Sequence, residues 1–480
     1  MNRTKIVATL GPACATEESI AALIETGVNV FRINASHGEK EEHIDRISSV
    51  RSVAARMRRP VGILLDLQGP KFRTGPLTNG KPVMLADNST VQLTSAVRET
   101  TEGIIGTKYR QIVEALDKDM MVLIDDGKIR LKVLRRVDEQ TVECLVMQGG
   151  ELDARKGINL PGTSIEVSAL TDKDREDALM AAHAQVDYIA LSFVQKARDV
   201  LELRSWIAKN GYACPMIIAK IEKPQALKDI DNIIKASDGL MVARGDLGVE
   251  LPPQDVPMVQ KMLVKKANDE GCPVIIATQM LESMVNSLQP ARSDVSDIAN
   301  AVLDKADALM LSMETATGHH PIETVQMMRK IIEQVESSHW LLPHMPHEPS
   351  SILSPNFFHA IAHSASYADT KADVKAIVVL SISGSMAKRV SRLKSQRPII
   401  ALTPDDKIYH QLSLYWGVTA LVIKIAEHTD ETLEAAEKAI LDNKMLRTGD
   451  SVVFCAGKTK MKGADNMLKI YRIGQPSHEN

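Results

Sequence analysis

Cysteine is scarce in this sequence of 480 residues. The cysteines are scattered, odd in number and free of any C-x-x-C spacing; they are Cys14, Cys144, Cys214, Cys272 and Cys455. Disulfide frameworks and zinc sites need cysteines in pairs at regular spacings, so neither is expected here. The pattern favours a protein of a reducing compartment.

An excess of basic residues and a long apolar run are also lacking. The 58 Lys and Arg residues are balanced by 61 Asp and Glu, so the chain has no basic field to hold nucleic acid. Near the N-terminus the apolar stretch is only Ile6 to Leu10, which is far too short for a signal-peptide core or a membrane span. We therefore expect a cytoplasmic protein with no nucleic-acid and no membrane partner.

The sequence does contain enough apolar residues for more than one core. They make up 44% of the chain, charged residues make up 25%, and the length predicts two or three domains. Eight short β-rich apolar runs recur at a spacing typical of βα units, most of them followed by a stretch of helical periodicity. The runs are Lys5 to Leu10, Val28 to Ile33, Val61 to Asp66, Asp187 to Ser192, Met216 to Ile221, Gly239 to Ala243, Pro273 to Thr278 and Asp307 to Ser312. Eight such units predict a (β/α)8 TIM barrel.

A long segment of different texture separates the third run from the fourth. Its alternating, turn-punctuated pattern predicts a small β-barrel lid domain, inserted after the C-terminal end of a strand. After the eighth run, further strands and helices predict a separate C-terminal α/β domain. We therefore expect the barrel at residues 1–69 and 169–343, the lid at 70–168 and a C-terminal α/β regulatory domain at 344–480.

Polar side chains follow the predicted barrel strands, at the end where all strands of a parallel barrel converge on one pocket. They are Arg32, Asn34, Ser36, His37, Asp66, Gln68, Lys71, Arg73, Lys220, Glu222, Arg244, Gly245, Asp246, Thr278, Gln279, Ser312 and Glu314. Carboxylates beside lysine and arginine suit a divalent cation that holds an anionic, phosphorylated substrate. Glu222 and Asp246 could share one Mg2+ or Mn2+, although a salt-bridged pair without metal gives the same pattern. The turn after Arg244 could hold a carboxylate on its backbone N–H groups or be a simple tight turn.

Eight segments, in order along nearly the whole chain, resemble the signature segments of the pyruvate kinase family. They are TKIVATLGPAC from Thr4, FRINASHG from Phe31, DLQGPKFRTG from Asp66, KGINLPG from Lys156, IAKIEK from Ile218, DGLMVARGDLGVE from Asp238, ATQMLESM from Ala277 and ALMLSMETATGHHP from Ala308. The resemblance implies the domain order described above. It also implies transfer of a phosphoryl group from phosphoenolpyruvate to ADP, giving pyruvate and ATP, in the last step of glycolysis.

The family resemblance also implies a role for each matching residue. Glu222 and Asp246 would bind the divalent cation, Mg2+ or Mn2+. Lys220, Arg32 and Arg73 would neutralise charge on the phosphoryl group; Thr278 and the amides of Gly245 and Asp246 would orient the substrate carboxylate; Ser312 and Glu314 would belong to a proton relay; Pro12, His37, Arg73 and Lys156 would contact the nucleotide. The group that delivers the proton stays open.

One departure from the family pattern concerns a monovalent cation. Many members hold K+ at positions matching Asn34, Ser36, Asp66 and the carbonyl of Leu67, and carry glutamate where this chain has Lys71. An ammonium group at that position could replace K+, so we expect a lysine-type, K+-independent member; the alternative is that Lys71 is a solvated charge at the lid hinge.

A serine-rich segment in the C-terminal domain, Ser381 to Ser385, follows one predicted strand and precedes a helix. It resembles the effector loop of regulated family members, so Ser383, Gly384 and Ser385 are expected to bind a phosphorylated allosteric effector, AMP or a sugar phosphate; an ordinary serine N-cap would look the same. Family members are usually homotetramers, and we expect the same here.

Two other functions fit part of the sequence. A divalent-metal barrel lyase or aldolase acting on pyruvate-like acids would also need paired carboxylates, but it has no need of a lid over a nucleotide. A catalytically silent, ligand-sensing paralogue is supported only by Met313, which stands between Ser312 and Glu314 where the family usually has glycine.

Overall fold

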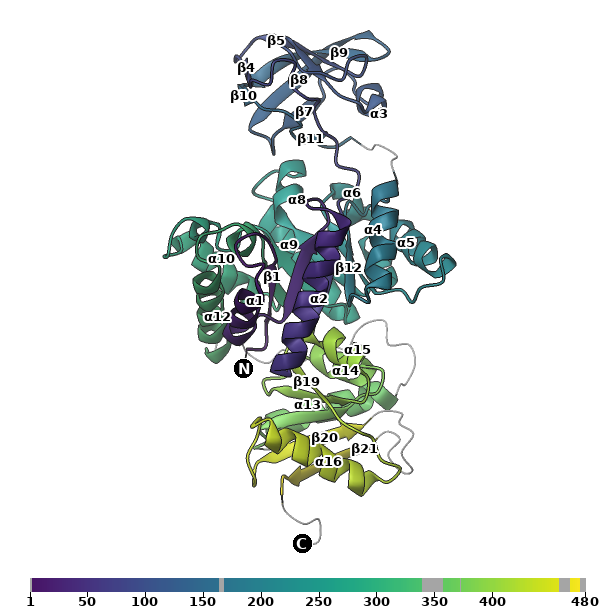
Figure 1. Ribbon diagram of the computed structural model, residues 1–480, viewed down its shortest axis with the longest axis vertical. Helices are drawn as coiled ribbons and strands as arrows, with labels where there is room; N and C mark the ends of the chain where they lie inside the picture. Colours follow the sequence, from purple (N-terminus) through teal and green to yellow (C-terminus); the bar gives the residue numbers. More distant parts are fainter. Residues whose placement is uncertain (1, 164–167, 339–356, 372, 457–466, 475–480) are drawn as a thin grey trace.

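A closed barrel of eight parallel strands forms the centre of the molecule (Figure 1). The computed structural model describes residues 2–163, 168–338, 357–371, 373–456 and 467–474. In spatial order β1-β16-β15-β14-β13-β12-β3-β2, the barrel strands are β1 (Lys5–Thr9), β2 (Val30–Asn34), β3 (Gly62–Asp66), β12 (Tyr188–Leu191), β13 (Met216–Ile221), β14 (Gly239–Ala243), β15 (Val274–Ala277) and β16 (Ala308–Leu311). Each overlaps one predicted run, so the barrel prediction is confirmed.

Helices surround the barrel. The long ones are α1 (Glu17–Thr26), α2 (Lys40–Met57), α4 (Asp172–His183), α5 (Ala197–Lys209), α9 (Val256–Glu270), α10 (Arg292–Leu303) and α12 (Pro321–Ser337), and the short ones are α6 (Pro224–Lys228), α7 (Ile230–Ala236), α8 (Arg244–Glu250), η1 (Glu282–Val285) and α11 (Met313–Ala316). Local signals set their ends: Thr171 and Asp174 form a capping box before α4, and Gly27, with φ 127°, ends α1. Buried side chains such as Leu64 and Ile218 fill the barrel, which is a packed core rather than a channel.

A separate sheet domain is inserted between β3 and α4. It contains a six-stranded sheet in the order β11-β7-β8-β9-β5-β6 and a two-stranded sheet of β4 and β10. The bounds are β4 (Val83–Leu85), β5 (Thr90–Thr94), β6 (Ile104–Gly106), α3 (Arg110–Glu114), β7 (Met121–Ile124), β8 (Ile129–Asp138), β9 (Thr141–Gln148), β10 (Gly150–Leu152) and β11 (Ile158–Asn159). Buried residues including Leu93, Ile105 and Val142 give it a core of its own. We call this domain the lid.

The C-terminal domain is a five-stranded sheet in the order β19-β18-β17-β20-β21, parallel except for its edge strand β21. Its elements are α13 (Phe357–Lys371), β17 (Ala376–Leu380), α14 (Ser385–Arg392), β18 (Ile399–Thr403), α15 (Asp406–Gln411), η2 (Leu412–Leu414), β19 (Val418–Val422), α16 (Thr429–Asp442), β20 (Ser451–Ala456) and β21 (Met467–Arg472). The boundary expected between residues 343 and 344 lies outside the described residues. In the described part of the chain, no helix is both long and apolar enough to cross a bilayer.

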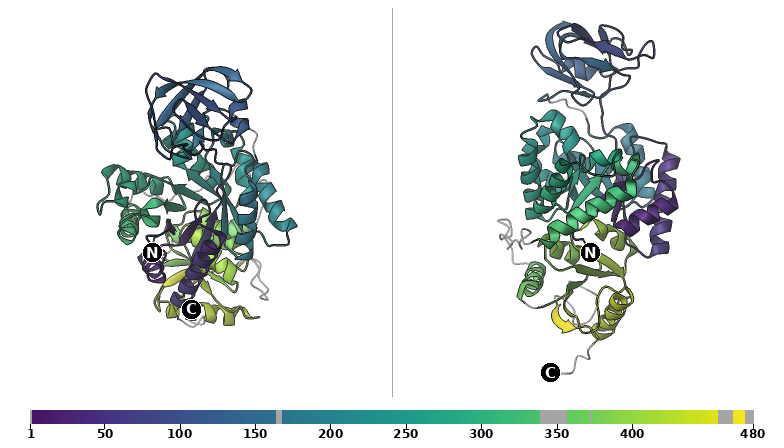
Figure 2. Two further views of the ribbon diagram at one scale, coloured as in Figure 1. Left: turned by 45° about the horizontal axis from the view of Figure 1, so that its top comes forward. Right: turned by 90° about the vertical axis from the view of Figure 1, so that its left-hand side faces the viewer.

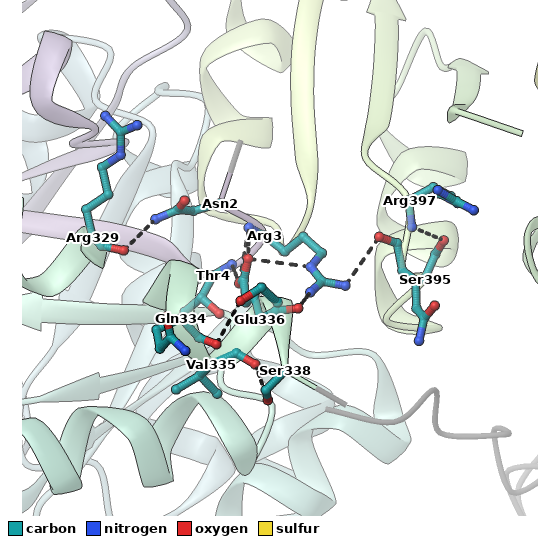
Figure 3. A network of polar contacts seen from close by, with 12 residues as sticks. Asn2, Arg3, Thr4, Arg329, Gln334, Val335, Glu336, Ser338, Ser395 and Arg397 are labelled. Carbon is teal, nitrogen blue, oxygen red and sulfur yellow. Dashed lines mark hydrogen bonds and ion pairs between the residues drawn. The ribbon is translucent and has the colours of Figure 1, made fainter. Parts of the chain in front are cut away.

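The lid and the C-terminal domain lie at opposite ends of the barrel (Figures 1 and 2). At the C-terminal domain's end, Figure 3 shows Glu336 of α12 between Arg3 and Thr4, whose backbone N–H groups donate to it at 2.8 and 2.7 Å. The Arg3 guanidinium also donates to the carbonyl of Gln396 at 3.2 Å, and the Arg3 carbonyl accepts from the N–H of Gly417. The N-terminal segment therefore joins the last barrel helix to the C-terminal domain.

Candidate active site

Charged side chains from three barrel strands meet at the C-terminal rim. Asp66 ends β3 and accepts from the Arg32 guanidinium of β2 at 2.7 Å. Its other oxygen lies 3.0 Å from the ammonium of Lys220 in β13, and the same ammonium lies 2.9 Å from Glu222. These contacts follow from the parallel barrel, which brings all strand ends to one rim. Arg32, Asp66, Lys220 and Glu222 therefore lie together at the rim, as the sequence predicts.

Burial and charge act against each other in this cluster. Burial by itself would raise the pKa of Asp66, but the charges of Lys220 and Arg32 hold that pKa below its ordinary value. Burial disfavours the charged form of Lys220, yet Asp66 and Glu222 raise its pKa, so it remains an ammonium. Burial raises the pKa of Glu222, and the charge of Asp246 adds to that rise against the opposing effect of Lys220. Asp66 and Glu222 thus share the single positive charge of Lys220.

The Glu222 and Asp246 pair has the chemistry of a divalent-cation site. Glu222 is 1% exposed, and Asp246 lies in the first turn of α8, which follows the next strand, β14. Among the described residues no group of three His, Cys, Asp or Glu side chains could hold a metal alone. Mg2+ is commonly held by one or two carboxylates, with substrate oxygens and water completing its shell. A cation between these two carboxylates would also relieve the repulsion that raises the Glu222 pKa.

Thr278 follows β15 in a strained backbone conformation, with φ 69°. Left-handed backbone in a β-branched residue costs roughly 1–3 kcal/mol and persists where surrounding contacts enforce it. The Thr278 hydroxyl accepts from the N–H of Gly245 at 2.8 Å, and the buried Arg244 guanidinium donates to the carbonyls of Thr278 and Gln279 at 2.6 and 3.0 Å. Arg244 was predicted among the rim charges; it is instead a buried clamp that holds this loop and pairs with Asp297.

Ser312 and Glu314 lie at the end of β16. A Glu314 carboxylate oxygen accepts from the N–H of Ser312 at 2.6 Å, and the side chain is 2% exposed. Burial raises the pKa of Glu314. The other oxygen, Oε1, has no hydrogen-bond partner among the described residues. Met313 is 53% exposed and lines the same pocket as Ser312 and Glu314, while Glu314 stays buried.

A pocket of ≈ 810 Å³ opens above these residues, a volume within the roughly 300–1,000 Å³ usual for small-molecule sites. Residues predicted for substrate, nucleotide, cation or proton transfer line it, namely Pro12, Arg32, Asn34, His37, Lys71, Thr278, Ser312 and Glu314. Glu42, Arg46 and Glu282 line it as well and were missed, because no sequence signal separates them from other solvated helix residues.

Two predicted site residues lie on the lid and not on the rim. The Arg73 guanidinium donates to the carbonyl of Arg155 at 3.0 Å, and the Lys156 ammonium pairs with Asp125 at 3.1 Å. Both side chains are thus engaged within the lid. Lid and rim residues could act together only after the lid moves toward the rim.

The expected monovalent-cation positions are brought together in part. Asn34 accepts from the N–H of Ser36 at 3.1 Å, and the carbonyl of Leu67 accepts from the Ser192 hydroxyl at 2.6 Å. Both Asp66 oxygens face the positive charges of Arg32 and Lys220. Lys71 lines the same pocket as Asn34.

The serine-rich segment of the C-terminal domain forms the predicted strand–loop–helix turn. It lies between β17 and α14, with Gly384 at φ 75° immediately before the helix. Ser383 and Ser385 are exposed, and their hydroxyls lie 3.1 Å apart. The hydroxyl of Ser381 accepts from the N–H of Met386 at 3.2 Å. Ser381 therefore caps the turn from within, while the other two hydroxyls face solvent.

Fold and rim together define a class: a multidomain (β/α)8 enzyme whose strand ends handle anionic substrates. Family models described as "Pyruvate kinase, barrel domain" and "Pyruvate kinase, alpha/beta domain" match residues 1–325 and 359–471. The chain belongs to the pyruvate kinase family, whose members are phosphotransferases.

Individual relatives cover almost the whole chain. The chain is 43% identical to "Pyruvate kinase 2" of Synechocystis over 98% of this chain and 79% of the relative. It is 40% identical to a pyruvate kinase of Agrobacterium vitis over 98% of this chain and 97% of the relative. A crystal structure of a pyruvate kinase from Cryptosporidium parvum matches with a TM-score of 0.92 and 34% identity, covering 98% of this chain and 96% of that one.

Proposed function

We propose that this pyruvate kinase transfers the phosphoryl group of phosphoenolpyruvate to ADP, giving pyruvate and ATP, in the rim pocket. The observation that carries the proposal is the buried cluster of Asp66, Lys220 and Glu222 beside Asp246. Phosphoryl transfer needs little covalent chemistry from the protein and depends on positioning and charge stabilisation. This cluster supplies both cationic groups and a carboxylate pair.

Glu222 and Asp246 are the residues that would hold Mg2+ or Mn2+. When bound, the cation neutralises negative charge on the substrate oxygens. Lys220 and Arg32 stabilise the phosphoryl group, and Asp66 holds the two cations side by side at the rim. Arg73 joins them, with Lys156, when the lid approaches the nucleotide bound near Pro12 and His37.

The remaining rim residues orient the substrate and deliver its proton. Thr278 and the amides of Gly245 and Asp246 hold the substrate carboxylate, and the strained Thr278 backbone keeps its hydroxyl at this position. Ser312 and Glu314, whose pKa burial raises, belong to the relay that delivers a proton through water to the enolate carbon.

Further features of the proposal concern regulation and context. Lys71 replaces K+ near Asn34, Ser36, Asp66 and the carbonyl of Leu67. A phosphorylated effector binds at Ser383, Gly384 and Ser385. The domains divide at residues 1–69 with 169–343, 70–168 and 344–480, and the enzyme is a cytoplasmic homotetramer.

A coupled assay for ADP-dependent pyruvate formation tests the activity and the cation requirements together. We expect pyruvate formation in buffer without K+ or Na+, and its loss when EDTA removes divalent cations. Lys71→Glu should restore a need for K+, because it replaces the ammonium by a group that attracts the cation. A wild-type rate that collapses without K+ contradicts the role of Lys71; no pyruvate under any condition contradicts the function.

A further inference from the structure

We propose that Glu250 is a positioning residue that braces the two metal-binding carboxylates and couples them to the lid. The proposal rests on the assignment of Glu222 and Asp246 as metal ligands. Glu250 is 6% exposed and ends α8, the helix whose first turn contains Asp246. The two residues are four apart, so they lie one above the other on the same helical face. A contact that fixes Glu250 therefore fixes the position of Asp246.

On the barrel side, Glu250 contacts the neighbour of the second carboxylate. Its Oε1 forms a buried ion pair with the ammonium of Lys223, the residue that follows Glu222. The Lys223 ammonium also lies 5.8 Å from the ring of Phe193, whose N–H donates to Glu222 at 2.8 Å. The ion pair thus ties the end of α8 to the end of β13. It sets the spacing of Glu222 and Asp246 from behind, without touching the substrate pocket.

On the lid side, the same carboxylate oxygen has a second partner. The side-chain amide of Asn159 donates to Glu250 Oε1 at 3.2 Å. Asn159 belongs to β11, the last lid strand, which pairs with β7 in the six-stranded sheet. Asn159, Lys223 and Asp246 also line one small cavity between the lid connections and the rim. Movement of the lid therefore changes the contact between Asn159 and Glu250.

The coupling has a physical cause in the burial of the carboxylate. Glu250 Oε2 is buried and has no hydrogen-bond partner among the described residues, so Oε1 carries the polar contacts of this group. If Asn159 withdraws with the lid, a buried charge loses a donor, and α8 can relax away from Lys223. Coupling of this kind is reciprocal: a cation that draws Glu222 and Asp246 together favours the lid position in which Asn159 contacts Glu250.

Asn159→Ala tests the brace while leaving the Lys223–Glu250 ion pair in place. The matched control is Gln225→Ala, because Gln225 donates to the carbonyl of Thr163 at 3.2 Å in the same hinge and, among the described residues, forms no hydrogen bond with α8. The measurement is Mn2+ affinity of the full-length protein without substrate, from the electron paramagnetic resonance signal of free Mn2+. We expect Asn159→Ala to weaken Mn2+ binding by about 3–10-fold and Gln225→Ala by less than about 2-fold. Glu250→Gln should weaken it by about 10–100-fold, as loss of an outer-shell partner does.

Glu222→Gln separates the brace from the assignment beneath it. If Glu222→Gln binds Mn2+ as the wild type does, the metal assignment fails and the brace falls with it. If Glu222→Gln loses Mn2+ but Asn159→Ala keeps wild-type affinity, the brace alone is wrong. Equal weakening in Asn159→Ala and Gln225→Ala, with equal loss of thermal stability, would also overturn the brace because it indicates general loosening of the hinge. Asn159→Ala carries the test should Glu250→Gln not fold.

Discussion

The two ends of the barrel bury ionisable groups in opposite ways. At the end that faces the C-terminal domain, two buried charges have partners within the protein: Lys394 pairs with Asp307 at 2.6 Å, and the buried Lys5 ammonium donates to the carbonyl of Val418. At the rim, Asp66 and Glu222 share the charge of Lys220, and Glu222 is also repelled by Asp246. The first arrangement is satisfied by the protein alone. In the proposed mechanism the second becomes satisfied when a cation and substrate bind, as expected of an active site.

Apolar contacts differ between the two ends as well. Leu414 of η2 packs into the same buried cluster as the barrel residues Val7 and Leu64, so the C-terminal domain closes that end of the barrel. The rim instead opens into a pocket lined by charged side chains. We therefore expect substitutions at the rim to change activity and substitutions at the closed end to change stability.

Glu222→Gln should have the largest effect of the substitutions that test this comparison. Removing one charged metal ligand should lower kcat by more than about 1,000-fold, since an interaction of this kind is worth several kcal/mol in the transition state. Stability should hold, because Lys220 keeps its contact with Asp66 and the repulsion between Glu222 and Asp246 is removed. Steady-state rates and the urea midpoint measure the two effects. A large fall in the midpoint would mean that Glu222 serves the fold and not the reaction.

Lys394→Met should give the reverse result at the closed end. The Lys394 and Asp307 side chains are only 6% and 5% exposed, and losing one partner leaves the other charge buried and unpaired, at a cost of about 3–5 kcal/mol. Asp307 also accepts from the N–H of Val274 at 3.0 Å, a contact that asparagine can keep. The double variant Lys394→Met/Asp307→Asn should therefore recover much of the loss. Urea unfolding gives the stability, and kcat per folded molecule should stay within about 2-fold; a rim-like fall in kcat would remove the distinction between the ends.

Patterns along the chain predict the barrel better than they predict its contacts. The barrel strands are buried on both faces and appear as continuous apolar runs, such as Ile63 to Leu65. Short or half-exposed strands were missed, including β4 with three residues and the edge strand β21, whose Lys469 and Arg472 interrupt any apolar run.

The candidate site was predictable where its residues follow strands. Lys220 and Glu222 follow from that rule. Ser192, whose hydroxyl accepts from Lys220 at 2.8 Å, also ends a predicted run but was not among the expected site residues. Asn159 and Glu250 are distant in sequence, and their contact depends on where the lid lies. Residues joined by tertiary packing alone therefore require the structure.

His410 offers the smallest and most specific test, because it places a titratable group at the closed end. Its Nδ1 accepts from the N–H of Val61 at 3.2 Å, which requires the neutral ring, and burial lowers the His410 pKa to about 4. The unfolded chain binds that proton near pH 6.5, so stability is present above pH 6.5 and is lost as the pH falls from 6.5 toward 4. We expect the loss to be about 1–2 kcal/mol, because the ring is only partly buried. Nearby Asp187, whose pKa burial raises to about 6, acts in the opposite direction between pH 6 and 4 and reduces the net loss in the wild type. His410→Asn keeps an acceptor for Val61 and removes the titration, so its urea midpoint should fall less over this range than that of the wild type. Parallel pH profiles for the two proteins would show that the closed end is insensitive to protonation of His410.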